Sequence, residues 1–184
     1  MPIGVIVIAL AAAVVMPQPA PKPSPGAGPV IVMETAKGTI EIETYPEDAP
    51  KTVEHILALV RRSFYNGLRV HRASGMVVQL GDPQTRDMTK RDLWGRGPAS
   101  GSGKPIGVAE ISKRRTHRRG AVGMAHAGDP RLADSQFYIM RRAEPSLDGK
   151  YAVFGHVISG MDVVDRLEVT DVVRRVYVKG EKKP

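Results

Sequence analysis

Ile31-Val32-Met33-Glu34-Thr35-Ala36-Lys37-Gly38-Thr39-Ile40-Glu41-Ile42-Glu43 is the stretch that decides the fold. In its second half apolar and polar residues alternate, so we expect Ile40 and Ile42 to face a core and both glutamates to face water. The Ala36-Lys37-Gly38 segment supplies a tight turn back to residues 31–34. The stretch therefore predicts an antiparallel β-hairpin.

The same kind of pattern continues along the chain. Short apolar runs are interrupted by Gly, Pro and Asp about every ten residues, which is typical of an all-β sandwich or barrel. Only two segments show helical spacing of apolar residues, residues 49–63 and residues 161–167. Residues 83–104 are polar and glycine-rich without any period, and we expect a long surface loop bordering a binding site.

The composition excludes several kinds of chemistry. The chain has 184 residues, of which 42% are hydrophobic, enough for one domain with a buried core. It has no cysteine, so disulfides, cysteine-based zinc sites and thiol catalysis are excluded. Its five histidines are scattered without ligand spacing, so we expect no metal and no cofactor. The net charge of +8 favours acidic partners but does not indicate a fold.

An apolar run opens the chain, and a proline-rich tract follows it. Residues 3–15 are almost all apolar, fewer than the about 20 residues that span a bilayer. We therefore predict a signal peptide over residues 1–20, a proline-rich linker over residues 21–29, and a folded domain over residues 30–184. This organisation indicates an extracytoplasmic protein, periplasmic or secreted, without a stable membrane span. No basic residue precedes the run, and an uncleaved anchor is the alternative.

Several blocks of the sequence resemble the cyclophilin family, and they follow in family order. The blocks are Tyr45-Pro46-Glu47-Asp48-Ala49-Pro50-Lys51-Thr52-Val53-Glu54, Phe64-Tyr65-Asn66-Gly67, Val70-His71-Arg72, Val78-Gln79-Leu80-Gly81-Asp82-Pro83, Met124-Ala125-His126-Ala127-Gly128 with Ser135-Gln136-Phe137-Tyr138-Ile139, and Leu147-Asp148-Gly149-Lys150-Tyr151-Ala152-Val153-Phe154-Gly155 running into Gly160-Met161-Asp162-Val163-Val164-Asp165. The resemblance implies a mainly β fold, a closed eight-stranded antiparallel barrel capped by two α-helices. It implies a peptidyl-prolyl cis-trans isomerase that binds its substrate on the outer wall of the barrel.

Isomerisation of an X-Pro bond needs a donor aimed at the prolyl nitrogen. The barrier is ~18–20 kcal/mol because the C–N bond has partial double-bond character. At the twisted transition state the nitrogen regains a lone pair and accepts a hydrogen bond that it could not accept in the planar amide. Arg72 is our candidate donor, because a guanidinium stays charged and presents rigid N–H groups.

Strand alternation predicts that four further side chains lie on the face of the sheet that points away from the core. In residues 77–80, Val77 and Gln79 share one face, and Gln136 and Tyr138 share one face in the same way. The amides would bind a peptide backbone and the apolar groups its proline ring. By resemblance, Gln79 holds a substrate carbonyl and acts with Arg72. The backbone at His126 pairs with the peptide. The proline pocket is Met76, Val77, Tyr138 and Leu147, and the groove lining is Ala125, Gln136 and Tyr151.

The sequence also departs from the family pattern. Met76 and Tyr138 replace Phe, His126 replaces Asn, Ser146 stands where some members have Trp, and Tyr151 where many have His. The rival hypothesis is therefore a non-catalytic proline-peptide binding or chaperone module on the same fold. The basic cluster of residues 113–119 could dock phosphates or an acidic client, although a solvated loop is the simpler interpretation. We expect a monomer that binds proline-containing flexible polypeptides and has no obligate nucleic acid.

Overall fold

A computed structural model describes residues 24–97 and 101–181 of the chain. The predicted signal peptide and part of the predicted linker lie outside these residues, so the domain boundaries stay a prediction. The strands are β1 (Val30–Thr35), β2 (Gly38–Thr44), β3 (Arg72–Ala73), β4 (Val77–Leu80), β5 (Ala121–Met124), β6 (Phe137–Met140), β7 (Val153–Ser159) and β8 (Val173–Val178). The α-helices are α1 (Pro50–Arg61) and α2 (Met161–Arg166), and the short 3₁₀ helices are η1 (Pro83–Arg86), η2 (Met88–Leu93), η4 (Pro130–Leu132) and η5 (Pro145–Leu147).

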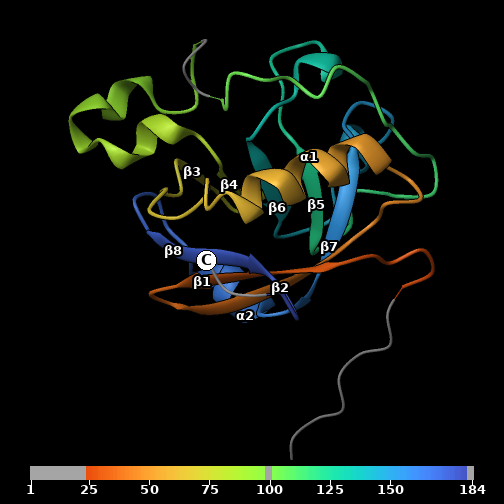
Figure 1. The fold of residues 1–184 in the computed structure, drawn as a ribbon, viewed down its shortest axis with the longest axis horizontal. Coiled ribbons are helices and arrows are strands. Elements are labelled where there is room, and N and C mark those ends of the chain that lie inside the picture. Colours follow the sequence, from red (N-terminus) through yellow and green to blue (C-terminus); the bar gives the residue numbers. More distant parts are fainter. Residues whose placement is uncertain (1–23, 98–100, 182–184) are drawn as a thin grey trace, which may run out of the picture.

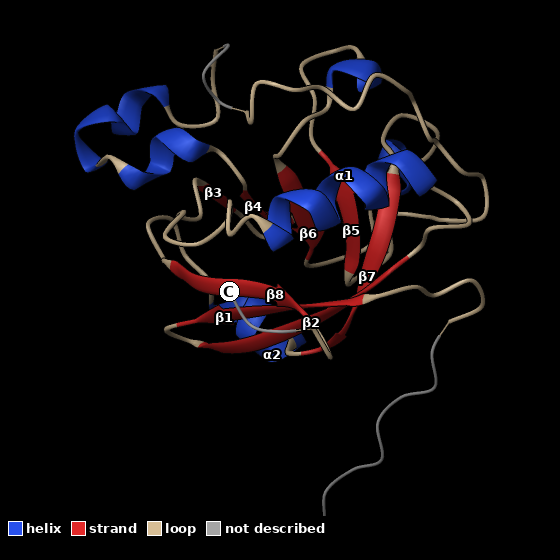
Figure 2. Cartoon of the chain, viewed as in Figure 1, coloured by secondary structure: helices blue, strands red, loops and turns tan. Residues whose placement is uncertain are grey.

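The eight described strands form one curled antiparallel sheet in the order β3-β4-β6-β5-β7-β2-β1-β8 (Figures 1 and 2). The prediction of a mainly β fold is confirmed, but the prediction of a closed barrel is wrong, because the sheet is open between β3 and β8. The end strand β3 has only two residues, and it pairs with β4 but not with β8. Across the gap runs a single isolated bridge from Arg69 to Val172, with backbone bonds such as Val70 N to Asp171 O at 3.0 Å.

The predicted hairpin is confirmed. Strands β1 and β2 pair from Val30 opposite Glu43 to Thr35 opposite Gly38, which places the turn where the sequence put it. Gly38 has a φ of +136°, and a Cβ there would come 2.7 Å from Val163. The glycine therefore gives the turn its backbone conformation and lets it pack against α2.

One of the two glutamates of β2 does not face water. Glu43 is only 2% exposed, and its carboxylate accepts hydrogen bonds from the Tyr45 hydroxyl at 2.9 Å and the Ser24 amide at 3.1 Å. Strand alternation did not predict this, because β2 lies inside the sheet and segment 24–29 passes over its end. These bonds outweigh the effect of burial and keep the pKa of Glu43 below its ordinary value.

Helix α1 lies across the concave side of the sheet and closes the main core (Figure 1). It begins at Pro50, where a proline fits because the first turn needs no intrahelical N–H donor. Its buried face is Thr52, Val53, Ile56, Leu57, Leu59 and Val60. Both predicted helices are confirmed, although α1 ends two residues earlier and α2 one residue earlier than predicted.

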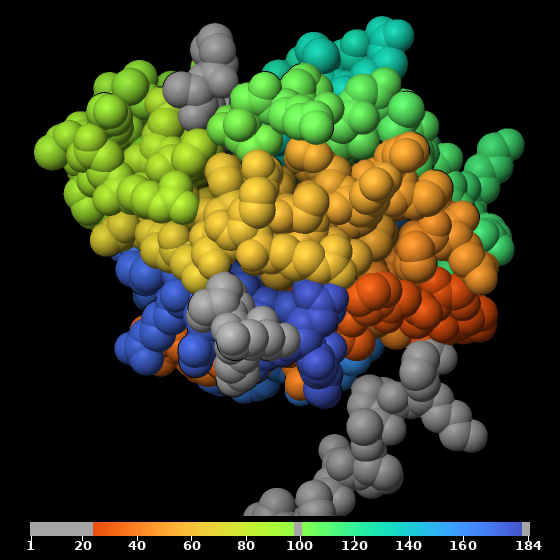
Figure 3. All heavy atoms as spheres, viewed as in Figure 1, coloured from red at the N-terminus to blue at the C-terminus, as the bar shows by residue number. Residues whose placement is uncertain are grey.

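The loop predicted over residues 83–104 contains more structure than we expected. Its first half folds into η1 and η2, which bulge from the body of the molecule in yellow-green (Figures 1 and 3). Each 3₁₀ helix is capped by an aspartate: Asp82 accepts from the Gln84 amide at 2.8 Å, and Asp87 from the Thr89 amide at 2.9 Å. Short capped turns of this kind leave no periodic signal in a sequence.

A buried carboxylate joins the start of α1 to the basic cluster of residues 113–119. The Asp48 side chain is 1% exposed and binds Arg115 at 2.7 Å, Arg114 at 2.9 Å and the Ser112 hydroxyl at 2.8 Å. Burial opposes its ionisation, but the bonds from Arg115 and Ser112 outweigh burial and lower the pKa of Asp48.

We expect Asp48→Asn to lower the free energy of unfolding by about 2 kcal/mol at neutral pH, because hydrogen bonds to a charged group are lost. Since the pKa of Asp48 is lower in the folded chain, this stabilisation is full above about pH 4 and disappears as the pH falls through the folded value. Urea unfolding of both proteins, at neutral pH and at a pH below the folded pKa of Asp48, measures this loss of stability. Asp162→Asn, in an exposed pair with Arg166, is the control and should change little. Equal stability of wild type and Asp48→Asn at neutral pH would contradict the prediction.

Candidate active site

Three polar side chains form a row on the outer face of the sheet. Antiparallel pairing of β3 with β4 sets Arg72 opposite Gln79. One guanidinium nitrogen of Arg72 lies 3.5 Å from Gln79 Oε1, and Gln79 Nε2 donates to Gln136 Oε1 at 3.0 Å. The Arg72 side chain is exposed and its contact with Gln79 is long, so N–H donors remain available to a ligand.

Beside this row lies a second, smaller apolar cluster of side chains, which we call the slot. Strand alternation separates the side chains of β4 and β6 as predicted: Val78, Leu80, Phe137 and Ile139 belong to the main core. The opposite face carries a separate apolar cluster, made of Val77, Ala121, Tyr138, Met140 and Val153. Packed against that cluster are the half-buried Met76, Ala125, Leu147 and Tyr151. The slot is therefore apolar and lies next to the exposed guanidinium of Arg72.

An aromatic rim borders the slot. The rings of His126 and Tyr151 lie 4.5 Å apart between centroids, and Tyr151 meets Tyr138 edge-on at 5.9 Å. His126 Nε2 lies 3.1 Å from the Lys150 carbonyl oxygen, which can only accept, so Nε2 carries the proton. The other nitrogen, Nδ1, is buried and has no hydrogen-bond partner among residues 24–97 and 101–181. It is thus a buried acceptor without a partner, next to the rim.

The arrangement suits rotation of an amide rather than bond cleavage. It offers an apolar slot for a ring, acceptors and donors for a peptide backbone, and one guanidinium at the edge. A model of the family described as cyclophilin type peptidyl-prolyl cis-trans isomerase/CLD matches residues 30–182. The chain belongs to this cyclophilin family.

Two curated relatives are each 38% identical to this chain. A "Probable peptidyl-prolyl cis-trans isomerase" of Brucella abortus (strain 2308) is 38% identical over 154 residues, covering 83% of this cyclophilin and 78% of the relative. The human "Peptidyl-prolyl cis-trans isomerase-like 3" is 38% identical over 149 residues, covering 80% and 86%. These matches place the chain in a family of isomerase enzymes.

Solved structures share the fold. A cyclophilin type peptidyl-prolyl cis-trans isomerase of Cryptosporidium parvum superposes with a TM-score of 0.70 at 22% identity, covering 84% of this chain and 99% of that one. A cyclophilin of Hirschia baltica gives a TM-score of 0.65 at 25% identity, covering 88% and 77%.

All ten site residues predicted for this cyclophilin lie on one face. Arg72, Gln79 and Gln136 form the polar row, and Val77 and Tyr138 form the buried floor of the slot. The walls and rim are Met76, Ala125, His126, Leu147 and Tyr151. Arg72 points toward Gln79 rather than into the sheet.

A hollow of about 660 Å³ lies beside the polar row. One wall contains Gln79, Ala125, His126 and Gln136. The lining also includes Gly95, Arg96, Gly97, Gly101, Gly103 and Pro105. The segment predicted to border a binding site therefore lines the same hollow as Gln79 and Gln136.

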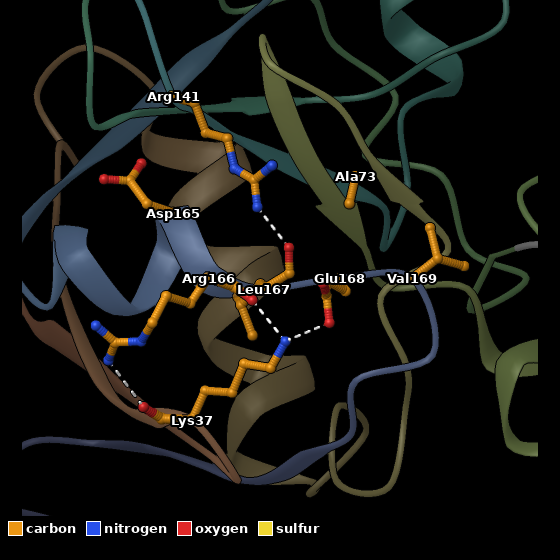
Figure 4. Close-up of a pocket in the computed structure, with 8 residues that line it drawn as sticks. All are labelled: Lys37, Ala73, Arg141, Asp165, Arg166, Leu167, Glu168 and Val169. Atoms are coloured by element: carbon orange, nitrogen blue, oxygen red, sulfur yellow. Dashed lines mark hydrogen bonds and ion pairs between the residues drawn. The ribbon is translucent and has the colours of Figure 1, made fainter.

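A second hollow of about 660 Å³ lies on another face, against α2 (Figure 4). Its charged side chains are bound within the protein. Lys37 pairs with Glu168 at 2.8 Å. Arg141 donates to the backbone carbonyls of Leu167 at 2.5 Å and Ser74 at 2.8 Å. Arg141 thus braces the turn before β4 against the end of α2. We interpret this hollow as structural.

Three of the five Lys and Arg side chains in the basic cluster of residues 113–119 are paired with carboxylates. Arg114 and Arg115 share Asp48, and Arg119 pairs with Asp165 at 2.5 Å. Such pairing does not favour a free phosphate-binding surface. The part of the chain that the structure describes contains no helix long and apolar enough to cross a membrane, and no group of three or more metal-ligating side chains.

The structure adds residues that sequence reasoning did not assign to the site. His117, a member of the basic cluster by sequence, turns inward and contacts Tyr138, while Gly123 faces the same tyrosine from β5. Asp148 binds His117 from the far side. The only sequence signal was the tyrosine at position 138, because a hydroxyl in an apolar pocket needs a partner.

Proposed function

We propose that this cyclophilin accelerates cis–trans rotation of X-Pro bonds in flexible polypeptides at the groove between Arg72 and Tyr138. The observation that carries the proposal is the exposed Arg72 guanidinium beside Gln79, at the edge of an apolar slot with Val77 and Tyr138 as its floor. No bond is made or broken in this reaction, so a slot and a donor suffice.

The slot and the guanidinium have different roles in the reaction. The apolar cluster removes the proline ring from water and holds it while the preceding residue turns. As the amide leaves planarity its nitrogen becomes a hydrogen-bond acceptor, and Arg72 donates to it. This bond exists only in the twisted state, so it lowers the barrier rather than merely tightening ground-state binding.

The polar row and the rim hold the rest of the peptide. Gln79 binds a substrate carbonyl through its amide, and its bond to Gln136 fixes the orientation of that amide. The backbone at His126, which lines the hollow beside the polar row, pairs with the peptide. In support, the Cryptosporidium parvum relative was crystallised in the presence of the dipeptide Ala-Pro, a ligand of the kind proposed here.

Exchange NMR on a short Ala-Pro peptide tests the proposal. Uncatalysed rotation takes tens to hundreds of seconds. We expect substoichiometric amounts of the full chain to bring cis–trans exchange into the sub-second range. The rival, a binding module that lacks catalysis, predicts shifted peptide signals without accelerated exchange, and that result would overturn the proposal.

We further propose that the isomerase is exported and assists the folding of polypeptides outside the cytoplasm. Support comes from the apolar run of residues 3–15 and the proline-rich tract that follows it. N-terminal sequencing of the chain from its producing cells checks this: a first residue between 17 and 29 agrees with export, and an intact Met1 contradicts cleavage.

A further inference from the structure

Behind the floor of the slot lies a hydrogen-bonded chain of three side chains. The Tyr138 hydroxyl is 2.8 Å from His117 Nε2, and His117 Nδ1 is 2.8 Å from Asp148 Oδ1. The same carboxylate oxygen accepts the backbone N–H of His117 at 2.7 Å. The His117 side chain is 1% exposed, so its imidazole makes both hydrogen bonds out of contact with water.

The partners fix the direction of the protons. Hydrogen bonds from the His117 side chain and backbone lower the pKa of Asp148, which is therefore a carboxylate that can only accept. A singly protonated His117 therefore carries its proton on Nδ1, facing Asp148, and its Nε2 accepts from the Tyr138 hydroxyl. Burial raises the pKa of Tyr138 well above its ordinary value, so the hydroxyl stays protonated and donates.

A glycine makes room for the hydroxyl. Gly123 lies opposite Tyr138 in the pairing of β5 with β6. A Cβ on Gly123 would come 2.5 Å from the Tyr138 hydroxyl oxygen and 2.6 Å from the ring carbon that bears it. Any other residue would push the ring out of its place. The space, the hydroxyl and its acceptor thus occur together in this chain.

His117 also touches other parts of the slot. Its ring meets Tyr151 edge-on at 6.3 Å and stacks near Tyr138 at 5.9 Å. Its carbonyl accepts the Glu144 amide at 2.8 Å, and the Glu144 carbonyl accepts the amide of the slot residue Leu147 at 3.1 Å. His117 therefore contacts the floor and the rim through its imidazole, and the turn that carries one wall through its backbone carbonyl.

We propose that His117, held by Asp148, is a positioning residue that fixes the Tyr138 ring as the floor of the proline slot. It acts on the affinity for the proline ring and not on rotation of the bound amide. Without its acceptor the buried hydroxyl turns toward water and carries the ring into the slot. This inference rests on the proposed function of the groove.

A double-mutant cycle on the full chain tests it, with KM, kcat and the Kd of an Ala-Pro peptide as readouts. We expect His117→Leu to raise KM and Kd roughly tenfold and to leave kcat within about twofold. Tyr138→Phe keeps the ring and removes only the hydroxyl, so it is the reference for the double variant. The double variant should bind within about threefold of Tyr138→Phe, because the group that needed the acceptor is absent.

Two results overturn the proposal. One is an unchanged Kd in His117→Leu, and the other is a double variant that is weaker than Tyr138→Phe by as much as His117→Leu is weaker than wild type, which would mean that His117 acts through the fold. If His117→Leu does not fold, His117→Gln, whose amide oxygen accepts the hydroxyl, replaces it and should bind like wild type.

The nitrogen-15 spectrum of the wild-type imidazole gives an independent readout, in which we expect the Nδ1–H tautomer. The Nε2–H tautomer overturns the inference. Failure of the proposed function is distinguishable, because a wild type that shows no exchange still has a peptide Kd on which the cycle is measured.

Discussion

Arg72→Ala is expected to lower kcat/KM for an X-Pro peptide by about 100- to 1,000-fold, the usual loss when one transition-state hydrogen-bond donor is removed. The loss should fall on kcat more than on KM, because the bond to the prolyl nitrogen exists only in the twisted state. The Arg72 side chain is exposed and makes only a long contact with Gln79, so the melting temperature should barely change. Exchange NMR and thermal unfolding measure the two effects.

Two further variants sharpen this test. Arg72→Lys keeps the charge but loses the planar fork of donors, so we expect intermediate activity. Arg142→Ala is the matched control, because Arg142 is an exposed arginine paired with Glu144 at 3.3 Å and lies outside the polar row. Activity of Arg72→Ala within about threefold of wild type would remove Arg72 from catalysis and favour the binding module.

Much of the fold could be predicted because its signals are local. Alternation of apolar residues assigned Val78 and Leu80 to the core and Val77 and Gln79 to the opposite face, and the structure agrees. The hairpin of β1 and β2 and both helices follow from equally local patterns. Such periodicities report which face of an element is buried, and this information is present in a few consecutive residues.

What the sequence could not predict depends on distant contacts. Whether the sheet closes depends on how β3, only two residues long, meets β8 at the other end of the chain. Glu43 is buried because segment 24–29 folds over it, and nothing around Glu43 in the sequence indicates that.

The site shows the same limit. Its exposed row and slot were predicted from strand alternation and the family blocks. His117 was not, because it lies in an irregular segment between exposed arginines, where no period tells which side chain turns inward. Its partner Asp148 comes from another loop, so only the folded chain brings the two together.

The spacing of the two amides in the polar row depends on a close backbone contact. Gly81 follows β4 and Ser135 precedes β6, and the Ser135 hydroxyl donates to the Gly81 carbonyl at 2.7 Å. Gly81 has a φ of +106°, and a Cβ there would come 2.2 Å from the Ser135 carbonyl oxygen. The Tyr65 hydroxyl holds that same carbonyl at 3.0 Å, so the backbone cannot easily yield.

We therefore expect Gly81→Ala to lower the free energy of unfolding by about 3 kcal/mol or more, combining the strain of a left-handed alanine with steric overlap. Urea unfolding measures this loss. In the molecules that remain folded, the ends of β4 and β6 must separate, which breaks the 3.0 Å bond between Gln79 and Gln136 and weakens peptide binding.

Gly75→Ala is the matched control for this prediction. A Cβ at Gly75 meets nothing within 4 Å, and its φ is not in the left-handed region, so stability should stay within about 0.5 kcal/mol of wild type. If Gly81→Ala were as stable as Gly75→Ala, the close approach of the two strands would not be what sets the distance between the amides. The orientation of Gln79 would then have to come from Arg72 and bound peptide alone.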